Sequence, residues 1–349
     1  MTSNFSSGTI NFSSGFAKNF QNDARRAEIR ATVSALCVAA KQISHICARG
    51  PLESGLGDAT GGANSDGDAQ KALDVRSDEI VTAALETAPV AYYASEEQDD
   101  VVTLDASKPL AVASDPLDGS SNIDTNVSIG TIFSIYTAKK DALSSFLRVG
   151  SEQICAGFFV YGPQTTLVIT AGAGTETYVL DPDTGNFELA IAHMKIAPAS
   201  TEYAINASNH RHWEAPVRSY IEDCLAGADG PLGEKYNMRW VGSLVADANR
   251  ILSRGGIFMY PGDDRKGYQE GRLRLLYEAN PVAFVIEQAG GIATNGALRI
   301  LGMSLESLHQ RVPFVFGSER PVQMVASYHH KKSVKSDSSQ LFNKRGLFR

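Results

Sequence analysis

Short apolar segments that end directly in acidic residues constrain the fold of this chain most. The run Val90–Ala94 is followed almost at once by Glu96 and Glu97, and the run Leu110–Ala113 is followed by Asp115. Runs of four or five apolar residues are typical of buried strands. Open α/β sheets place their ligands at the carboxyl ends of strands. The pattern therefore predicts an α/β fold with an acidic site at one edge of a sheet.

Apolar residues at three- and four-residue steps predict helices over 24–48 and 75–88, separated by a glycine-rich loop over 50–67. Runs of β-branched and aromatic residues predict strands over 129–137, 157–161, 166–170, 177–180, 203–206, 239–241 and 257–260. A further helix is expected over 243–254. The helical pattern over 273–289 contains Pro281, which predicts a break or kink because proline cannot donate a backbone hydrogen bond.

These elements form two α/β blocks, so the predicted fold class is α/β, a layered sandwich. Residues 24–195 would form an N-terminal α/β domain with most of the acidic site, and residues 196–328 a C-terminal α/β domain. Residues 1–23 contain the letters NFSSG twice and are rich in Ser, Gly and Asn, which predicts a flexible arm. Residues 329–349 are rich in Lys and Ser, which predicts a polar basic tail.

The chain is acidic, with 39 Asp and Glu residues against 32 Lys and Arg residues and a formal net charge of -7. Proteins that bind nucleic acid or an anionic membrane through their general field need a basic patch, so we expect neither partner. Four cysteines without a C-x-x-C pair favour reduced thiols and a cytoplasmic location. We find no apolar run of about 18 residues and no secretory pattern, so no membrane span is expected.

The strongest chemical signal is the run Asp115-Pro116-Leu117-Asp118-Gly119-Ser120-Ser121-Asn122-Ile123-Asp124. Its first two aspartates are three residues apart across a proline turn, where both carboxylates can converge on a hard divalent cation. The glycine permits close backbone approach, and successive N–H groups with the two serine hydroxyls can hold an anion. An Asx turn that merely ends the strand is the alternative. The full run favours a metal site beside a phosphate site.

Other acids occur in suitable positions. Asp68 and Asp74 precede the second predicted helix, and Glu96 and Glu97 follow a strand. Each of these alone is typical of a helix cap or a solvated charge. Glu278 differs because it lies in the apolar run Leu-Leu-Tyr-Glu-Ala, where a carboxylate is costly unless it is paired or bound to a metal.

On these motifs the chain resembles the class I fructose-1,6-bisphosphatases from about residue 25 to residue 328. The motifs are DPLDGSSNID at 115–124, VSIGTIFSIY at 127–136, VGSLVAD at 241–247, GGIFMYP at 255–261 and GRLRLLYEANP at 271–281. The related inositol monophosphatases share DPLDG but typically continue with Thr-Thr-Asn. The resemblance implies a sugar-phosphatase fold and hydrolysis of the 1-phosphate of fructose 1,6-bisphosphate to fructose 6-phosphate and inorganic phosphate.

The resemblance also implies two or three Mg2+ ions, for which Mn2+ could substitute. The implied ligands are Glu96, Glu97, Asp115, the backbone carbonyl of Leu117, Asp118 and Glu278. An all-oxygen ligand set of this kind suits Mg2+. The implied catalytic residues are Asp74 with Glu97, which would orient and deprotonate the attacking water, and Asp68 with Arg274, which would position a mobile loop and assist phosphoryl transfer.

The implied substrate contacts are Asp118, Gly119, Ser120, Ser121, Asn206, Arg239, Trp240, Tyr260 and Arg272. Arg239 would reach the 6-phosphate across a subunit interface, which implies an oligomer, and the family is typically a homotetramer. Trp240 and Asn209 stand where tyrosines are usual, and Arg272 stands where animal members have lysine. Sedoheptulose 1,7-bisphosphate is therefore an additional candidate substrate. AMP inhibition is expected to be weak or absent, because the AMP-binding residues of animal members have no match.

Two other functions stay open on the sequence alone. One is a lithium-sensitive phosphatase that acts on an inositol or nucleotide phosphate, and the other is a catalytically silent metabolite sensor on the same fold. A substrate panel separates the first alternative from a bisphosphatase, and the second is disfavoured because every acid expected to bind metal is present. The pathway served, gluconeogenesis or the Calvin cycle, does not follow from the sequence.

Overall fold

The computed structural model describes residues 10–52, 59–63 and 69–329. The helices are α1 Asp23–Arg49, α2 Ala72–Glu86, α3 Ala215–Ala226, α4 Leu244–Arg254, α5 Asn280–Gln288 and a helical segment at 319–329. The strands of the first half are β1 Ala59–Ala63, β2 Ala69–Lys71, β3 Val90–Ser95, β4 Val102–Thr103, β5 Leu110–Asp118, β6 Ile129–Thr137, β7 Cys155–Tyr161, β8 Thr165–Thr170, β9 Thr175–Leu180 and β10 Phe187–Met194. Those of the second half are β11 Glu202–Ala204, β12 Asn237–Met238, β13 Ile257–Tyr260, β14 Leu273–Arg274, β15 Ile292–Thr294, β16 Arg311–Val312 and β17 Phe314–Gly317.

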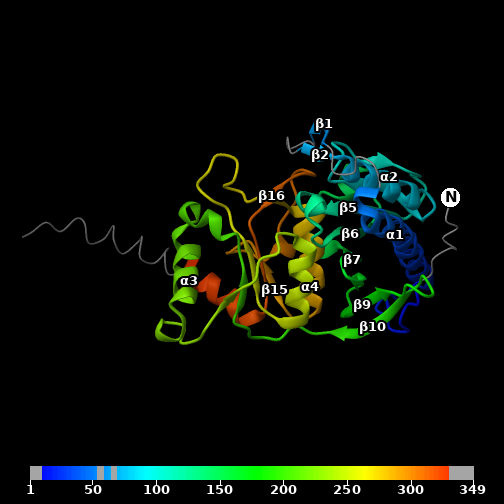
Figure 1. Ribbon diagram of the computed structural model, residues 1–349. Coiled ribbons are helices and arrows are strands. Elements are labelled where there is room, and N and C mark those ends of the chain that lie inside the picture. The colour runs from blue at the N-terminus through cyan, green and yellow to red at the C-terminus, as the bar shows by residue number, and fades with distance from the viewer. Residues whose placement is uncertain (1–9, 53–58, 64–68, 330–349) are drawn as a thin grey trace, which may run out of the picture.

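Two mixed sheets form the framework of the molecule (Figure 1). The larger has eight strands in the order β10-β9-β8-β7-β6-β5-β3-β4, and the smaller has five in the order β12-β11-β13-β17-β15. Two short antiparallel pairs, β1-β2 and β14-β16, complete the described strands. The larger sheet is antiparallel except for the parallel pair β3-β5. The predicted α/β class is confirmed.

Helices cover both faces of the larger sheet, so that helical and sheet layers alternate. One face packs on α1 and α2 through one apolar cluster, and the other packs on α4 and α5 through a second cluster that also contains residues of the smaller sheet. A third cluster joins the far face of the smaller sheet to α3 and the segment 319–329. Because both faces are covered, all nine residues of β5 are buried. The second cluster joins the two halves, and the predicted division at residue 195 stays a prediction.

Several predicted elements are confirmed within a few residues, among them α1, α2, β3, β6, α4 and β13. The pattern over 273–289 does break, but it starts as the strand β14, continues as a π-helical turn, η7 Leu275–Ala279, and only then becomes α5. Pro281 is the second residue of α5, so the break in the helical pattern lies directly before this proline, in the π-helical turn.

Three predicted segments differ from the structure. The strand expected over 239–241 is wrong, because the N–H groups of Val241 and Gly242 donate to the Asp247 carboxylate and the strand β12 lies earlier. The run 115–118 is part of β5 and does not merely follow it. The loop expected over 50–67 contains β1, which pairs with β2; residues 53–58 and 64–68 lie outside the described residues.

The described part of the predicted N-terminal arm, residues 10–22, is packed against the protein body. Ile10 forms a bridge with Phe187, and Phe16 and Ala17 are buried. The hydroxyl of Ser13 donates to the carboxylate of Glu176. This segment differs from a solvated arm because its few apolar side chains find places in the cluster around α1. Residues 1–9 and the predicted tail after residue 329 lie outside the described residues.

By length and hydropathy, α1 is the single described helix that could cross a membrane. Of its most apolar window, 44% is buried inside the protein, and its buried face packs on α2 and β7. Buried core helices can have the same length and hydropathy, so these two properties of α1 are weak evidence for a membrane span.

Gly130 lies where β6, β7 and α4 approach closely. A Cβ atom at this position would lie 2.0 Å from the carbonyl oxygen of Phe159 and 2.6 Å from a methyl group of Val245. We expect Gly130→Ala to lower the free energy of unfolding by about 1–3 kcal/mol, because neither β7 nor α4 can move without disturbing the core. Urea denaturation measures this change.

Gly302 supplies the matched control, because a Cβ atom there would meet nothing within 4 Å. Gly302→Ala is expected to stay within about 0.5 kcal/mol of the original chain. Equal urea midpoints for Gly130→Ala and Gly302→Ala would contradict the close approach of β7 and α4 to Gly130.

Candidate active site

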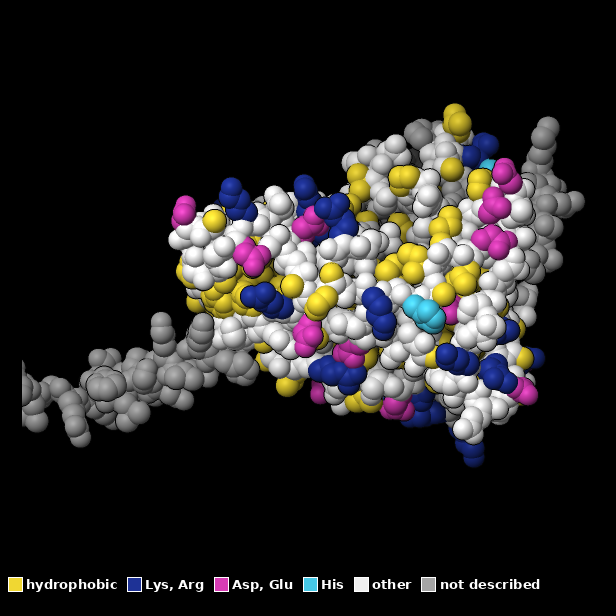
Figure 2. Space-filling view, turned by 90° about the horizontal axis from the view of Figure 1, so that it is seen from below, with side chains coloured by type: hydrophobic (Ala, Val, Ile, Leu, Met, Phe, Trp, Pro, Cys, Tyr) yellow, Lys and Arg dark blue, Asp and Glu magenta, His cyan; other side chains and the backbone are white. Residues whose placement is uncertain are grey.

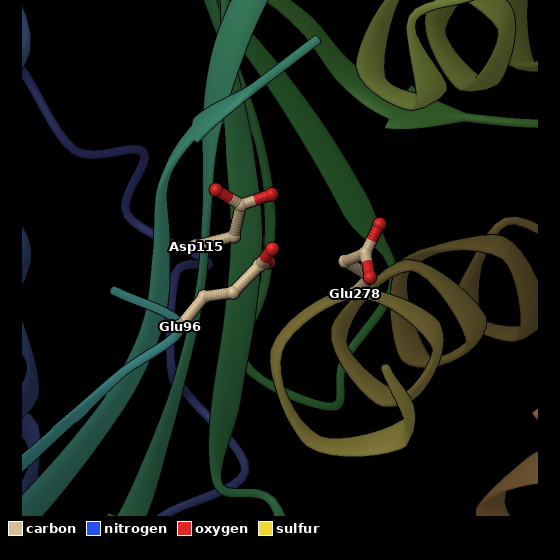
Figure 3. A group of neighbouring side chains, drawn as sticks. All are labelled: Glu96, Asp115 and Glu278. Carbon is tan, nitrogen blue, oxygen red and sulfur yellow. The ribbon is translucent and has the colours of Figure 1, made fainter. Parts of the chain in front are cut away.

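Three buried carboxylates face one another where the two halves of the protein meet (Figure 3). Glu96 follows β3, Asp115 belongs to β5 and Glu278 belongs to η7, and one oxygen of each lies within 4.8 Å of the others. β3 and β5 are parallel neighbours, and the N–H of Glu96 donates to the carbonyl of Ser114 at 3.0 Å. The adjacent strand ends therefore bring the first two acids together. We call this group the acidic triad.

A bulge in β5 brings Asp118 to the triad. In a regular strand, residues three apart point to opposite faces. Here the pairing with β6 shifts register between Asp115 and Asp118, and the carbonyl of Pro116 accepts a hydrogen bond from the Thr131 hydroxyl at 2.8 Å. The N–H of Leu117 donates to Asp115 at 3.0 Å. Asp118 thereby lies close enough to raise the pKa of Asp115.

Burial and mutual repulsion raise the pKa values of these carboxyl groups. Burial is the larger cause for Glu96 and Asp115, whose pKa values lie well above the usual range, and repulsion between the neighbouring carboxylates adds to it. Burial raises the pKa of Glu278 to about 7, with opposition from the Arg274 guanidinium. Burial also raises the pKa of Asp118 to about 6, although hydrogen bonds from Val245 and Ser243 oppose the shift. The site favours cations or protons.

The donors around the triad fit a hard cation. Arg274 Nη1 lies 2.7 Å from Glu96 Oε1, and the backbone N–H of Arg274 donates to Glu278. The other oxygen of Glu96 is buried and accepts no hydrogen bond among the described residues. An orphaned carboxylate oxygen beside two further carboxylates suits Mg2+ or a similar ion, which prefers oxygen ligands. The residues present therefore fit the metal that the sequence predicts.

A further buried acid, Asp78 of α2, supports the end of β3 and was not predicted. Its carboxylate accepts hydrogen bonds from the Tyr93 hydroxyl at 3.0 Å, the Ser95 hydroxyl at 2.6 Å and the Gln98 amide at 2.6 Å. The Ser95 hydroxyl in turn accepts from the N–H of Glu97 at 3.2 Å. Asp78 thus orients the segment that carries the paired glutamates. Its spacing of four residues from Asp74 on one helix was the available sequence signal.

The N-terminus of α4 holds Asp118. The Val245 N–H donates to Asp118 Oδ2 at 2.9 Å and the Ser243 hydroxyl donates to the same oxygen at 3.1 Å. Gly119, with φ of +84°, follows directly and lies against Ser243, where a Cβ atom would approach to 3.2 Å. The Asn122 amide donates to the carbonyl of Gly242 at 3.0 Å. The run 115–124 is therefore tied to the segment 241–247.

Another set of predicted residues lies at the carboxyl ends of β11 and β13. These strands are parallel neighbours, Asn206 follows β11 by two residues, and Tyr260 is the last residue of β13. The Trp240 ring centroid lies 6.1 Å from that of Tyr260. Burial raises the pKa of Tyr260, and the nearby Arg272 guanidinium opposes this shift. Asn206, Trp240, Tyr260 and Arg272 are called the distal group below.

The remaining predicted residues are placed as follows. Glu97 lies within electrostatic range of the triad, and Leu117 lies within β5 between the two aspartates. Asp74 is buried in the first turn of α2 and is not a member of the triad. Ser120 and Ser121 open the 3-10 turn that follows Gly119, and the half-exposed Arg239 lies 4.0 Å from Glu202. Asp68 lies outside the described residues.

Two family models match the chain. They are described as "Fructose-1-6-bisphosphatase, N-terminal domain", over residues 14–192, and "Fructose-1-6-bisphosphatase, C-terminal domain", over residues 196–330. A Cereibacter sphaeroides protein named fructose-1,6-bisphosphatase class 1 1 is 53% identical over 327 residues, which cover 94% of this chain and 97% of that protein. The chain belongs to the class 1 fructose-1,6-bisphosphatase family.

Further relatives agree with this membership. A Methylorubrum extorquens protein named fructose-1,6-bisphosphatase class 1 is 54% identical over 325 residues, 93% of each chain. The crystal structure of Leishmania major fructose-1,6-bisphosphatase in holo form is similar with a TM-score of 0.82 at 36% identity, over 87% of this chain and 95% of that one. The predicted sugar-phosphatase fold of this fructose-1,6-bisphosphatase family member is confirmed.

The raised pKa values predict how stability depends on pH after divalent cations are removed. The pKa values of Asp118 and Glu278, about 6 and about 7, exceed those of the unfolded chain, so the folded state binds more protons between about pH 4 and pH 7. This contribution to stability is complete below about pH 4 and is lost as pH rises through 7. Urea midpoints at pH 5.5 and pH 8, measured with a chelator, should reveal it.

Glu278→Gln removes one of these titrating groups and serves as the comparison. We expect the loss of stability between the two pH values to be smaller in this variant by roughly 2 kcal/mol. The same pH dependence in both chains would refute the placement of Glu278 among repelling carboxylates.

Proposed function

We propose that this chain is a Mg2+-dependent phosphoric monoester hydrolase that converts fructose 1,6-bisphosphate to fructose 6-phosphate and inorganic phosphate. The acidic triad carries the proposal, because three buried carboxylates with an orphaned oxygen suit a hard divalent cation. Membership in the fructose-1,6-bisphosphatase family supports the choice of substrate. The 1-phosphate would bind at the triad and the 6-phosphate at the distal group.

The acids of the first half would provide the metal site. When bound, Mg2+ would supply positive charge beside the phosphate and lower the pKa of a water molecule. The proposed ligands for two or three ions are Glu96, Glu97, Asp115, the carbonyl of Leu117, Asp118 and Glu278. Mn2+, an ion with similar ligand preferences, could substitute.

Other side chains near the triad would carry the proton and the charge of the reaction. Asp74 and Glu97 would orient the attacking water and accept its proton. Arg274, held against Glu96, would place a guanidinium near the transferring phosphoryl group. The role of Asp68 beside Arg274 rests on the family resemblance alone.

The sugar would lie between the triad and the distal group. Gly119, Ser120 and Ser121 would face the 1-phosphate, and Asp118 would contact the sugar. Asn206, Trp240, Tyr260 and Arg272 would surround the other end. The planar fork of Arg272 can bind a phosphate through two hydrogen bonds, which also allows sedoheptulose 1,7-bisphosphate as a second substrate.

An oligomer would explain the position of Arg239. This side chain is 54% exposed, and the neighbouring apolar side chains of Met238 and Val241 are 46% and 38% exposed. Exposed apolar residues around a substrate residue suit a subunit interface, so we propose a homotetramer in which Arg239 serves a neighbouring subunit. On the face seen in Figure 2, acidic and basic side chains are interspersed, which suits a cytoplasmic enzyme of carbohydrate metabolism without a nucleic-acid or membrane partner.

Phosphate release from a substrate panel tests the proposal. The panel contains fructose 1,6-bisphosphate, sedoheptulose 1,7-bisphosphate, inositol 1-phosphate and fructose 1-phosphate, each with Mg2+ or with a chelator. We expect Mg2+-dependent release from the first and a large loss when the distal phosphate is missing. Preference for inositol 1-phosphate, or no release from any substrate at saturating Mg2+, would overturn the proposal.

Asp118→Asn tests the site at one residue. The amide keeps the size of the side chain but removes a negative charge from the proposed ligand set, so we expect turnover to fall by at least about 100-fold. The exposed Asp183 in the turn after β9 provides the control, and Asp183→Asn should leave turnover unchanged. Circular dichroism of both variants checks folding, and full turnover by folded Asp118→Asn would contradict the assignment.

A further inference from the structure

Two arginine side chains lie on one tyrosine ring in the segment that leads to Arg272. Residues 261–272, which connect β13 to β14, are called the distal loop. In this loop the Cζ atoms of Arg265 and Arg272 lie 4.4 Å and 5.0 Å from the ring centroid of Tyr268. Both distances fall within the roughly 6 Å over which an aromatic face attracts a cation. The Tyr268 ring therefore contacts the arginine of the distal group directly.

Arg265 is held in place by a buried acid. Its Nε atom donates to both oxygens of Asp263, at 3.0 Å and 3.1 Å, and its Nη2 atom donates to one of them. Asp263 is buried, and these hydrogen bonds hold the pKa of its carboxyl below the usual value. A forked pair of this kind has one preferred geometry. Asp263 thus offsets the charge of Arg265 and fixes its guanidinium against the Tyr268 ring.

Backbone hydrogen bonds close the distal loop around Tyr268. The Tyr268 carbonyl accepts from the N–H groups of Asp263 and Gly271, each at 3.0 Å, and the Tyr268 N–H donates to the Arg265 carbonyl at 3.0 Å. Gly271 has φ of +76°, and a Cβ atom there would lie 2.5 Å from the Val312 carbonyl oxygen. The chain just before Arg272 therefore has a fixed path between Tyr268 and β16.

The loop is also attached to the segment that follows Asn206. Trp213 forms a β-bridge with Asp263, and the Asp264 N–H donates to the carbonyl of His212 at 3.2 Å. The His212 ring nitrogen Nδ1 lies 2.9 Å from an Asp264 oxygen. The distal loop thereby connects the segment that follows Asn206 to the segment that leads to Arg272.

We propose that Tyr268 is a positioning residue that holds the Arg272 guanidinium beside Tyr260, ready for the phosphate farthest from the acidic triad. The inference rests on the proposed function, because it takes that phosphate as the ligand of Arg272. A free arginine side chain loses rotamer freedom when it binds a ligand, and contact with a fixed ring removes part of that loss before binding. Tyr268 would therefore raise the affinity for substrates with a distal phosphate and leave the chemical step unaltered.

Tyr268→Ala, Tyr268→Phe, Arg272→Ala and the double variant Tyr268→Ala/Arg272→Ala test this role. For fructose 1,6-bisphosphate with Mg2+, Tyr268→Ala should raise KM by about 3- to 10-fold with little change in kcat. Tyr268→Phe keeps the aromatic face and should restore the original KM. In the Arg272→Ala background, the loss of Tyr268 should have no further effect. An equal rise in KM on Tyr268→Ala in the original chain and in the Arg272→Ala chain would overturn the inference.

A substrate without the distal phosphate separates positioning from general damage. Tyr268→Ala should leave the inhibition constant of fructose 1-phosphate unchanged. An equal loss of affinity for fructose 1-phosphate and fructose 1,6-bisphosphate would refute the inference. Lys266→Ala is the matched control, since it removes an exposed cation from the same loop and should leave KM unaltered.

Calorimetric binding of fructose 6-phosphate keeps the inference separate from the proposed function. If the chain binds fructose 6-phosphate through Tyr268 and Arg272 but hydrolyses no bisphosphate, the proposed reaction fails and the positioning role stands. If hydrolysis occurs and Tyr268→Ala binds fructose 6-phosphate as tightly as the original chain, the positioning role fails alone. Absence of both hydrolysis and binding would overturn both.

Discussion

The burial of three carboxylates within 4.8 Å of one another is the constraint on which the rest of the molecule depends. At an effective dielectric constant of about 20, each ionised pair at this separation repels by roughly 3.5 kcal/mol. Three such pairs amount to roughly 10 kcal/mol, which is comparable to the whole unfolding free energy of an ordinary domain. Arg274 beside Glu96 supplies one positive charge. Protons or further cations have to neutralise the rest, and oxygen ligands of this charge favour a divalent ion.

The segment between β12 and α4 sets the distance between the two ends of the candidate site. Its N-terminal part carries Trp240 of the distal group, and the hydroxyl of its last residue, Ser243, donates to Asp118, as does the N–H of Val245 in the first turn of α4. Asp247, which is fully buried, accepts hydrogen bonds from Val241 and Gly242 and so keeps this short segment in one conformation. On the proposed function, a rigid connection of this kind would favour substrates of one length, because neither end could move toward the other without breaking these hydrogen bonds.

Local sequence patterns were sufficient for the parts of the site that neighbouring residues determine. Acids directly after apolar runs predicted a ligand site at the ends of strands, and the apolar surroundings of Glu278 predicted a paired or ligated carboxylate. That Glu96 and Asp115 belong to one site was implied by the family resemblance. Contacts between distant elements gave no local signal. Asp78 supports Ser95 from another element, and the expected strand after Met238 is absent because Asp247 takes its N–H groups. The roles of individual residues in catalysis stay predictions, because geometry alone does not assign them.

The two ends of the candidate site use opposite charge arrangements. At the triad three carboxylates face the single guanidinium of Arg274, so the chain itself supplies more negative than positive charge, and on the proposed function a phosphate would need cations from solution. At the distal group the cation belongs to the chain, and Tyr268 contacts it within a closed loop. On the proposed function, a bisphosphate that met the metal-free protein would therefore be held by its distal phosphate and repelled at the other end. On the same proposal, the net charge of -7 does not oppose anion binding at the distal group, and the orientation of the substrate would depend on a divalent ion at the acidic triad.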